Sequence, residues 1–170
     1  MASDNILIIG GGPAGLEAAR GVADLGYRTV LVETRDRLGG TPIAESYAAL
    51  THGMRDATEV MEEMAAAVTG HPQVDVRRGT RGTACEGAAG DFRVTLEGGA
   101  GQETVAAGAI IVATGFDHFD PGRASQQYGY YLYDDVITLS EAEAMLKARK
   151  FVRPSTGEPP ERVCFIQCVG

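Results

Sequence analysis

A glycine-rich turn between an apolar run and a helical segment constrains the fold of this chain more than any other feature. Residues 5–10 (NILIIG) predict a short buried parallel strand, and residues 13–25 have helical spacing. The turn between them, GGGPAG at 10–15, fits the pattern G-x-G-x-x-G. A second predicted strand, 28–33, ends in Glu33. This order predicts a βαβ unit of the Rossmann type.

The spacing of the motif specifies a way to hold a dinucleotide. Gly10 allows the tight turn, Gly12 lets a pyrophosphate approach the backbone, and Gly15 lets the helix pack close to the strand. The helix whose first turn contains Pro13 and Ala14 offers free N–H groups and the positive end of its dipole to the phosphates. Alone the motif is weak, because glycine-rich turns are common, but its place between strand and helix is what the fingerprint requires.

Glu33 stands where such a site places its acidic residue. It follows Gly10 by 23 residues (33 minus 10), close to the spacing of about 20 expected for a carboxylate that binds ribose hydroxyls. A carboxylate here would repel a 2′-phosphate, so NADP is disfavoured. The positive charge of the nearby Arg35 would offset part of that repulsion. The alternative interpretation is a structural turn followed by a solvated glutamate.

Two later features favour FAD over NAD. A Gly-Gly pair that includes Gly40 follows the acidic strand end, and a predicted strand at 109–113 ends in A-T-G, which resembles the second fingerprint of two-dinucleotide-binding-domain flavoproteins. A plain NAD-dependent dehydrogenase would instead repeat βαβ units. Here the middle of the chain predicts short strands separated by glycine-rich turns, as in a β-meander, at residues 74–77, 80–86, 92–96 and 103–106.

The fold class predicted is therefore α/β, a Rossmann-type FAD-binding domain with a parallel sheet and a β-meander. We expect FAD to be held by eleven residues, namely Gly10, Gly12, Pro13, Ala14, Gly15, Glu33, Thr34, Gly40, Ala113, Thr114 and Gly115. No catalytic side chain and no metal site is identified, since the histidines are scattered without metal-ligand spacing.

The remaining segments predict helices, a linker and one last strand. Helices are expected at 44–50 and 54–68, the second with a core-facing stripe of methionines. A short helix at 141–150 is expected to be capped by Ser140, with Glu143 in the capping-box position. A linker follows at 153–160, and an apolar strand at 162–169.

Three domains follow from this order. Residues 1–118 form the FAD-binding domain, 119–160 a connecting segment with a short helix, and 161–170 the first strand of a second nucleotide-binding-type domain. Because an apolar strand followed by glycine normally leads into a helix, we expect the fold to be C-terminally incomplete.

Charge and cysteine content narrow the function further. Fifteen Lys and Arg against 23 Asp and Glu give a net charge of −8, which argues against nucleic-acid binding. The absence of a signal peptide and of a long apolar run predicts a cytoplasmic protein, with membrane association only through partners.

Cys164 and Cys168 would lie about 13 Å apart on a straight strand, too far for a disulfide. Cys85 and Cys164 are interpreted as small structural hydrophobes, and the role of Cys168 stays open.

The second half of the chain resembles a known family. Four segments resemble the A subunit of heterodisulfide reductase and the related A subunit of the quinone-interacting membrane-bound oxidoreductase. They are GAIIVATGFDHFDP, YGY, DDVITLSEAEAML and PSTGEPPERVCFIQCVG. The resemblance implies a thioredoxin-reductase-like flavoprotein that relays electrons between FAD and iron–sulfur, disulfide- or quinone-linked partners in a multi-subunit complex. The family's iron–sulfur ligands do not carry over to this chain, and Thr41–Ala44 lacks the cysteine pair of disulfide reductases.

Two other functions remain open. One is an NAD(P)H-dependent flavoprotein reductase that lacks its nicotinamide domain. The other is a non-catalytic fragment that acts only in assembly.

Overall fold

The chain forms two compact units. The computed structural model describes residues 4–50, 53–99 and 101–167. The first unit comprises Met1–Ala44 and Thr58–Gly115, and the second comprises Glu45–Ala57 and Phe116–Gly170. The short segment 45–57 therefore leaves the first unit and returns to it.

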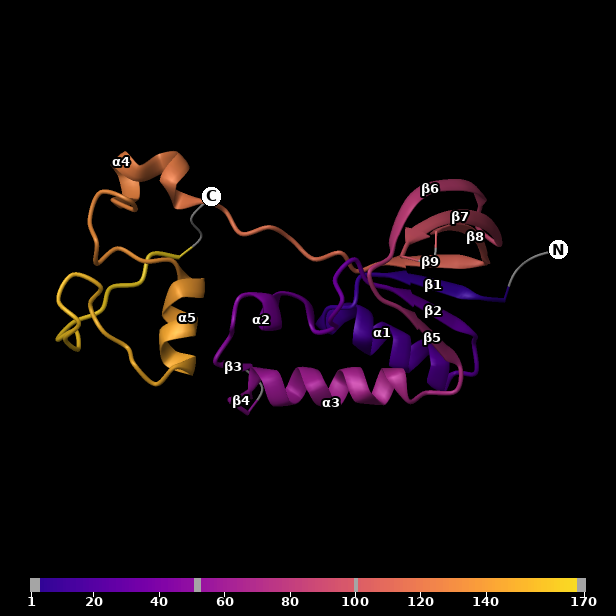
Figure 1. The fold of residues 1–170 in the computed structure, drawn as a ribbon, viewed down its shortest axis with the longest axis horizontal. Coiled ribbons are helices and arrows are strands. Elements are labelled where there is room, and N and C mark those ends of the chain that lie inside the picture. Colours follow the sequence, from indigo (N-terminus) through magenta and orange to yellow (C-terminus); the bar gives the residue numbers. More distant parts are fainter. Residues whose placement is uncertain (1–3, 51–52, 100, 168–170) are drawn as a thin grey trace. The chain divides into compact units, whose positions relative to one another are not determined.

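A four-stranded parallel sheet is the centre of the first unit (Figure 1). Its strands are β1 (Ile6–Ile9), β2 (Thr29–Val32), β5 (Val74–Arg77) and β9 (Ala109–Val112), in the order β5-β2-β1-β9. All pairs are parallel. In chain order this is 3-2-1-4, the order of a Rossmann half. Every residue of β2 is buried, as expected for a parallel strand covered on both faces.

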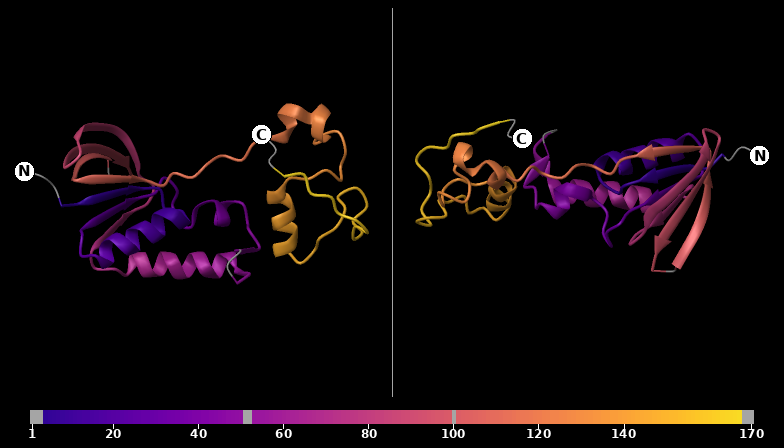
Figure 2. Two further views of the ribbon diagram at one scale, coloured as in Figure 1. Left: turned by 180° about the vertical axis from the view of Figure 1, so that it is seen from behind. Right: turned by 90° about the horizontal axis from the view of Figure 1, so that it is seen from above.

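Helices cover one face of this sheet and a meander covers the other (Figures 1 and 2). The helices are α1 (Pro13–Asp24) and α3 (Ala57–Thr69). The meander is the antiparallel sheet of β6 (Arg81–Ala88), β7 (Asp91–Gly98) and β8 (Gly101–Ala107).

Alternation along the strands builds two separate hydrophobic clusters. Leu7 of β1 packs with Val94 and Leu96 of the meander. The next residue, Ile8, packs with Leu16 of α1 and with Val68 of α3. Successive side chains of a strand point to opposite faces, so one short apolar strand supplies both layers.

The predicted fold class is confirmed, but the prediction that residues 74–77 belong to the meander is wrong. They form β5, which pairs in parallel with β2. The meander starts only at Arg81.

The predicted helix at 44–50 is wrong. A short helix, α2 (Gly40–Ala44), comes earlier and ends at the first residue of that range. Ser46 has a φ of 55°, which interrupts helical geometry. The strand β3 (Ala49–Leu50) then pairs with β4 (Arg55–Asp56). Pairing between segments thus overrides the local helix preference.

The methionine stripe belongs to the core, as expected for most of its members. Ala57, Met61 and Val68 of α3 are buried, and Met64 packs against the helix-side cluster. Met54 is 74% exposed because it precedes β4 and α3 instead of lying within the helix.

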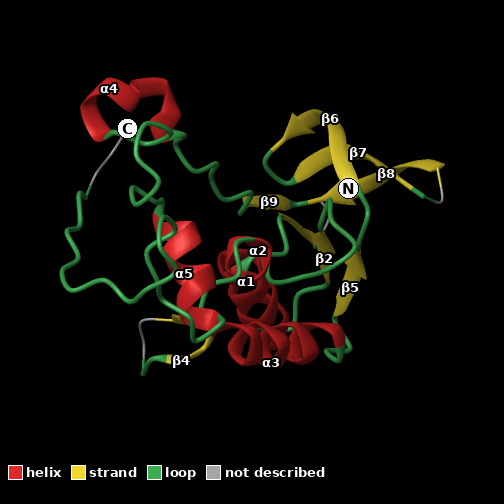
Figure 3. Cartoon of the chain, turned by 60° about the vertical axis from the view of Figure 1, so that its left-hand side comes forward, coloured by secondary structure: helices red, strands yellow, loops and turns green. Residues whose placement is uncertain are grey.

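The second unit contains little regular structure (Figure 3). Its helical parts within 116–167 are a 3₁₀ turn at Pro121–Ala124, α4 (Ser125–Tyr128) and α5 (Leu139–Lys147). The cap of α5 is Thr138, which forms a capping box with Glu141. Ser140 is therefore not the cap, contrary to the sequence-based prediction. Both threonine and serine fit the S/T-x-x-E pattern, and the earlier one is used.

The apolar segment predicted as a final strand has no strand over 162–167. No strand elsewhere in the described ranges pairs with it, so its backbone lacks the hydrogen bonds that join neighbouring strands. Cys164 in this segment is exposed, and so is Cys85 on β6, hence neither is a buried structural hydrophobe. Cys168 and His52 lie outside the described residues.

Among the residues that the structure describes, no helix combines the length and the apolar character needed to cross a membrane.

Candidate functional site

The eleven predicted site residues all lie in the first unit, where the parallel strands end. They come from four places: the β1–α1 turn, the end of β2, the start of α2, and the end of β9. Carboxyl ends of parallel strands meet at one edge of a sheet, which is where open α/β folds bind ligands. The residues are Gly10, Gly12, Pro13, Ala14, Gly15, Glu33, Thr34, Gly40, Ala113, Thr114 and Gly115.

Two glycines of the turn are required by the chain's own packing. Gly10 has a φ of 112°, and a Cβ atom there would lie 2.2 Å from the carbonyl oxygen of Ala113. A Cβ atom at Gly15 would lie 1.8 Å from the carbonyl oxygen of Gly10. Both contacts are far inside van der Waals distance. The first strand, the first helix and the end of β9 can approach this closely only without these side chains.

Gly12 is different, because the protein leaves space beside it. A Cβ atom at Gly12 would meet only the Cα atom of Gly40, at an ordinary 3.6 Å. Gly12 is also the N-cap of α1, where no side chain caps the helix and no acidic residue occupies the first turn. The backbone N–H groups of Ala14 and Gly15 belong to the first turn and have no acceptor within the helix, so this terminus is suited to an anion.

Glu33 is held at the end of β2 and is only 6% exposed. Its Oε2 accepts a hydrogen bond from the backbone N–H of Gly11 at 2.7 Å. Its Oε1 accepts from the backbone N–H of Arg35 at 2.8 Å and from the hydroxyl of Thr34 at 3.1 Å. A carboxylate has about four acceptor positions, so these donors leave room for one more.

The Gly-Gly loop is tied to the glycine-rich turn. The backbone N–H of Gly39 donates to the carbonyl of Gly11 at 2.8 Å. Gly40 has a φ of 60°, and a Cβ atom there would lie 2.7 Å from the Cα atom of Gly12. The pair of glycines therefore permits both an unusual backbone and a close crossing of two loops.

Sequence reasoning missed Gly11 and Leu38 as members of this site. Gly11 donates to Glu33, and a Cβ atom there would lie 2.6 Å from the Cδ2 atom of Leu38. Leu38 is 5% exposed. The signal available was the single apolar residue between the charged run 35–37 and the two glycines.

The end of β9 lies beside the end of β1 and is joined to it by a backbone hydrogen bond. The backbone N–H of Ala113 donates to the carbonyl of Ile9 at 2.8 Å. Thr114 is exposed, and Gly115, with a φ of 76°, has open space where a Cβ atom would be. The A-T-G segment thus supplies an exposed hydroxyl and an uncrowded backbone beside the glycine-rich turn.

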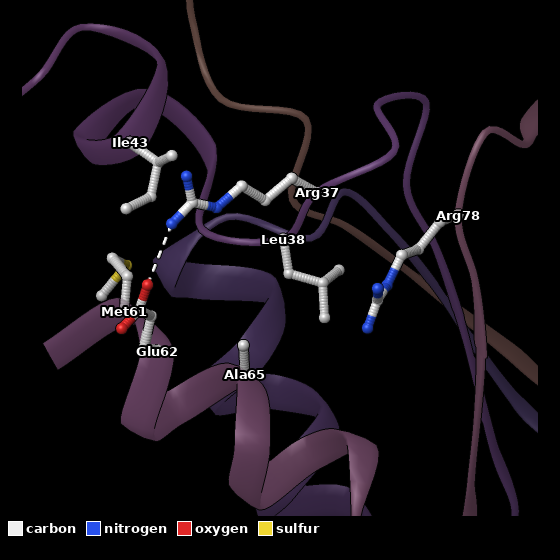
Figure 4. A pocket seen from close by; sticks show the side chains of 7 residues that line it. All are labelled: Arg37, Leu38, Ile43, Met61, Glu62, Ala65 and Arg78. Carbon is white, nitrogen blue, oxygen red and sulfur yellow. Dashed lines mark hydrogen bonds and ion pairs between the residues drawn. The ribbon is translucent and has the colours of Figure 1, made fainter. Parts of the chain in front are cut away.

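Two hollows flank this region. One, of about 210 Å³, adjoins the end of β2 and is lined by Thr34, Gly79, Thr80, Arg81, Glu97 and Gly98. The other, of about 100 Å³, lies between the Gly-Gly loop and α3, where Arg37 forms a 3.0 Å ion pair with Glu62 (Figure 4). The first is the larger of the two, and Thr34 at the end of β2 lines it.

An arginine at the end of β5, Arg77, is paired with two carboxylates. Burial alone would lower the pKa of Arg77, but hydrogen bonds and attraction from Asp75 and Glu103 raise that pKa overall. The arginine therefore stays charged and joins β5 to the meander strand β8. In the part of the chain that the structure describes, no group of three or more His, Cys, Asp or Glu side chains is arranged to hold a metal ion.

The family description that matches this chain is pyridine nucleotide-disulphide oxidoreductase, over residues 4–152. The chain belongs to this family. This agrees with the thioredoxin-reductase-like fold expected from the sequence.

Curated relatives belong to heterodisulfide reductases. The chain is 27% identical over 251 aligned positions to the A subunit of the ferredoxin/F(420)H(2)-dependent CoB-CoM heterodisulfide reductase of Methanosarcina acetivorans. That alignment covers 99% of this chain and 31% of the relative. An iron–sulfur A subunit of the CoB–CoM heterodisulfide reductase from Methanopyrus kandleri is 50% identical over 68 residues, covering 37% of this chain and 10% of the relative. The chain thus spans about a third of the length of the relatives that it matches throughout.

Solved structures show the same fold. The thioredoxin reductase of Lactococcus lactis aligns with a TM-score of 0.57 and 26% identity, over 75% of this chain and 41% of that one. The L-proline dehydrogenase of P. horikoshii aligns with a TM-score of 0.59 and 25% identity, over 65% of this chain and 22% of that one.

Proposed function

We propose that the first unit binds FAD through the eleven residues at the carboxyl edge of its parallel sheet. The pyrophosphate would lie at the N-terminus of α1 beside Gly12, where the backbone N–H groups of Ala14 and Gly15 have no acceptor within the helix. A ribose hydroxyl would donate to the remaining acceptor position of Glu33. The hollow beside Thr34 gives room for an adenine ring.

The open space at Gly12 is the observation that carries this proposal. Gly10 and Gly15 are explained by close packing within the protein, whereas at Gly12 no protein atom would lie nearer than 3.6 Å to an added Cβ atom. The space lies at a helix terminus without a side-chain cap. A phosphate group would occupy the space, and it would accept hydrogen bonds from the first-turn N–H groups that no side chain caps.

Bound FAD would supply the redox chemistry, accepting or giving one or two electrons. The chain's own residues bind and orient the cofactor. We propose that the flavin relays electrons to iron–sulfur, disulfide- or quinone-linked partners within a multi-subunit assembly. The names of the heterodisulfide reductase relatives contain a disulfide, ferredoxin and the word subunit, which supports the disulfide and iron–sulfur partners. Iron–sulfur clusters would then be held by partner chains.

The domain division stays part of the proposal. Residues 1–118 would form the flavin domain and 119–160 the connection, and 161–170 would become a strand when a second nucleotide-binding-type domain is present to pair with it. The exposed apolar side chains of Phe165 and Ile166 support this last step, since they are 70% and 63% exposed.

The family description also favours a second function, an NAD(P)H-dependent flavoprotein reductase. In that case NADH or NADPH would bleach the bound flavin of a longer protein that carries a nicotinamide domain. An assembly role without redox activity corresponds to a chain that has no affinity for FAD.

The first experiment is a titration of the purified chain with FAD, followed by flavin absorbance and fluorescence. Glu33→Gln keeps the side-chain shape but replaces one acceptor oxygen with a donor NH₂ group. Hydrogen bonds to charged groups contribute about 1.5–3 kcal/mol, so affinity should fall roughly 10- to 100-fold.

Glu86→Gln on the exposed strand β6 is the matched control and should leave affinity unchanged. Equal FAD affinity in the Glu33 and Glu86 variants would contradict the assigned role of Glu33. A wild-type chain that does not bind added FAD would contradict the proposal as a whole.

A further inference from the structure

Three consecutive large side chains are exposed on the loop that joins α4 to α5 in the second unit (Figure 1). Tyr131 is 74% exposed, Leu132 is 60% exposed and Tyr133 is 69% exposed. Single exposed apolar residues are ordinary on a protein surface, whereas contiguous patches of them mark interaction sites. The proposed FAD site lies in the first unit and uses none of these residues. The exposed group therefore needs an explanation of its own.

Backbone hydrogen bonds hold this loop in one shape. The N–H of Gly129 donates to the carbonyl of Ser125 at 2.6 Å. The carbonyl of Gly129 accepts from the N–H groups of Leu132, at 2.9 Å, and Tyr133, at 3.0 Å. The N–H of Val136 then donates to the carbonyl of Tyr133 at 3.1 Å. The exposed side chains are thus presented by a fixed turn, which lowers the entropy cost of binding to them.

Tyr131 has a strained backbone within this turn. Its φ is 67°, in the left-handed region that non-glycine residues rarely adopt. Strain of this kind persists only where surrounding contacts enforce it, and it gathers at functional sites. A glycine would adopt this conformation readily, yet the chain has a large aromatic side chain here.

Two glycines make room for the inner sides of the tyrosine rings. A Cβ atom at Gly122 would lie 2.6 Å from Cδ2 of Tyr131, and one at Gly129 would lie 2.7 Å from Cδ2 of Tyr133. Each ring therefore lies directly against a glycine backbone. Because both tyrosines are still mostly exposed, the other side of each ring is open to solvent. We call this pair, Tyr131 and Tyr133, the tyrosine platform.

Tyr130 joins the platform to α5. Its ring centroid lies 4.2 Å from that of Tyr131, and its hydroxyl donates to Oε1 of Glu141 at 3.2 Å. Burial raises the pKa of Tyr130 to about 12, and the negative charge of Glu141 contributes to this rise. The phenol therefore stays protonated at neutral pH and keeps its hydrogen bond to the helix.

A carboxylate lies beside the ring of Tyr131. The Cβ position at Gly122 that is 2.6 Å from this ring is also 2.9 Å from Oδ1 of Asp120. Oδ1 accepts from the backbone N–H of Gly122 at 2.8 Å, which orients the carboxylate. In the described part of the chain, no ion pair joins Asp120 to a cation. A carboxylate has about four acceptor positions, so Asp120 can accept further hydrogen bonds from a bound cation.

The charges near the platform favour a cation over an anion. Residues 116–141 contain five carboxylates and a single arginine, Arg123. Asp135 is attracted by Arg153, but Asp134, which adjoins Tyr133, forms no ion pair among the residues that the structure describes. A nucleic acid or an anionic lipid headgroup would be repelled here.

We propose that the tyrosine platform and Asp120 form a docking site for an arginine-bearing segment of a partner protein. A guanidinium group is planar and always charged, and it stacks on aromatic faces. On the open side of Tyr131 it is attracted by the ring, while its N–H groups donate to Asp120. A second cation of the same segment lies on Tyr133 beside Asp134. This inference goes beyond the proposed function and does not depend on FAD.

The test is a fluorescence anisotropy titration of the purified chain with a fluorescein-labelled peptide of alternating arginine and serine, at an ionic strength of about 0.15 M. Tyr131→Ala should weaken binding roughly 2- to 30-fold. Tyr131→Phe should keep most of the affinity, because the ring remains. A peptide with citrulline in place of arginine keeps the shape without the charge and should not bind. Wild-type affinity in Tyr131→Ala would overturn the proposal.

Matched controls separate a site from the general attraction of an acidic chain for a basic peptide. Asp120→Asn removes one charge but keeps an oxygen that can accept from Gly122, and it should weaken binding roughly 2- to 5-fold. Asp4→Asn removes the same charge from an exposed position of the first unit and should keep wild-type affinity. Tyr27→Ala removes a tyrosine that is 48% exposed in the first unit and should also keep it. Equal weakening by Asp4→Asn and Asp120→Asn would show that net charge alone attracts the peptide, and would overturn the proposal.

A second readout uses the wild-type chain and so does not depend on the folding of any variant. With isotope-labelled tyrosine rings, the NMR signals of Tyr131 and Tyr133 should shift when the arginine peptide is added, and that of Tyr27 should not. Shifts that leave out the platform would contradict the assigned surface. Self-association through Tyr131 without peptide binding would assign the surface to a second copy of the chain. Binding to phosphatidylcholine vesicles in place of the peptide would assign it to lipid, and either result would overturn the proposal.

Discussion

At the glycine-rich turn, neighbouring glycines serve different physical purposes, and substitution by alanine should separate them. In Gly15→Ala the new methyl group would lie 1.8 Å from the carbonyl oxygen of Gly10. The first helix must then move away from the first strand, and overpacking of this kind costs about 1–3 kcal/mol or more. In Gly12→Ala the methyl group meets only ordinary contacts. Because Gly12 is the N-cap of α1, where glycine is preferred over alanine, that variant should lose about 0.5–1 kcal/mol of unfolding free energy, less than Gly15→Ala, and should lose affinity for FAD.

Gly21→Ala is the control, because no atom lies within 4 Å of its Cβ position on α1. It should stabilise the helix by about 0.5–1 kcal/mol. Denaturant unfolding and FAD titration of the three variants check these expectations. A Gly12→Ala chain that is as unstable as Gly15→Ala would mean that both glycines serve packing alone.

The residue scale is also where the sequence was most informative about the site. The roles of Gly10 and Gly15 depend on local geometry that the motif specifies directly. Gly11 and Leu38 could not be found in this way, since their importance comes from a contact between two loops that are distant in sequence. Glu33 was proposed from its spacing, and its three protein donors became visible only in the fold.

At the scale of elements, the capping of α5 gives a direct comparison of two neighbouring hydroxyl residues. Thr138 accepts from the backbone N–H of Glu141, and the Glu141 carboxylate accepts from the backbone N–H of Thr138. Thr138→Ala should destabilise α5 by about 1 kcal/mol, seen as faster amide hydrogen exchange along that helix. Ser140→Ala, which removes no cap, should exchange at the wild-type rate. Faster exchange in Ser140→Ala alone would restore the sequence-based prediction.

The turn that follows α5 should respond to pH through Asp135. The backbone N–H of Ser155, at 3.0 Å, and its hydroxyl, at 2.8 Å, hold the pKa of Asp135 below its usual value. A carboxyl whose pKa is lowered by folding stabilises the fold above its unfolded-state pKa, and this contribution is lost as the pH falls through the folded-state value. Ser155→Ala removes the hydroxyl alone, so the pKa of Asp135 should rise towards its ordinary range.

Carboxyl-carbon NMR titration of Asp135 in the wild-type chain and in Ser155→Ala measures this shift. An Asp135 titration that is the same with and without the Ser155 hydroxyl would rule out this contact as the cause.

Segments with a clear apolar pattern were predicted well, and segments whose structure depends on a particular contact elsewhere in the chain were not. The strands β1, β2 and β9, the helix α1 and most of α3 follow from their apolar patterns, whereas β5 was expected as a strand of the meander. The segment 44–50 has good helix formers, yet Ala49–Leu50 pairs with Arg55–Asp56. The apolar run 162–167 has the composition of a strand but lacks a pairing partner in the described ranges. Glu143, expected in a capping box, instead accepts from Ala48, 95 residues away.

At the scale of the whole molecule, the two units should differ in stability. The first unit has two hydrophobic clusters, one on each face of its sheet. Among the described residues of the second unit, the buried hydrophobic side chains are only Ala57 and Ala142, while Tyr131 is 74% exposed. Because burial of apolar area is the main stabilising contribution, the second unit should unfold first.

Scanning calorimetry should therefore show two transitions, with the first unit unfolding at the higher temperature. Added FAD should raise the upper transition alone, since the proposed site lies entirely in the first unit. At a free FAD concentration about 100 times the dissociation constant, the gain would be about 2.7 kcal/mol. Glu33→Gln should reduce that gain at the same FAD concentration, whereas Glu86→Gln should preserve it. If FAD instead raised both transitions equally, binding would couple the two units, and residues of the second would have to be counted as part of the cofactor site.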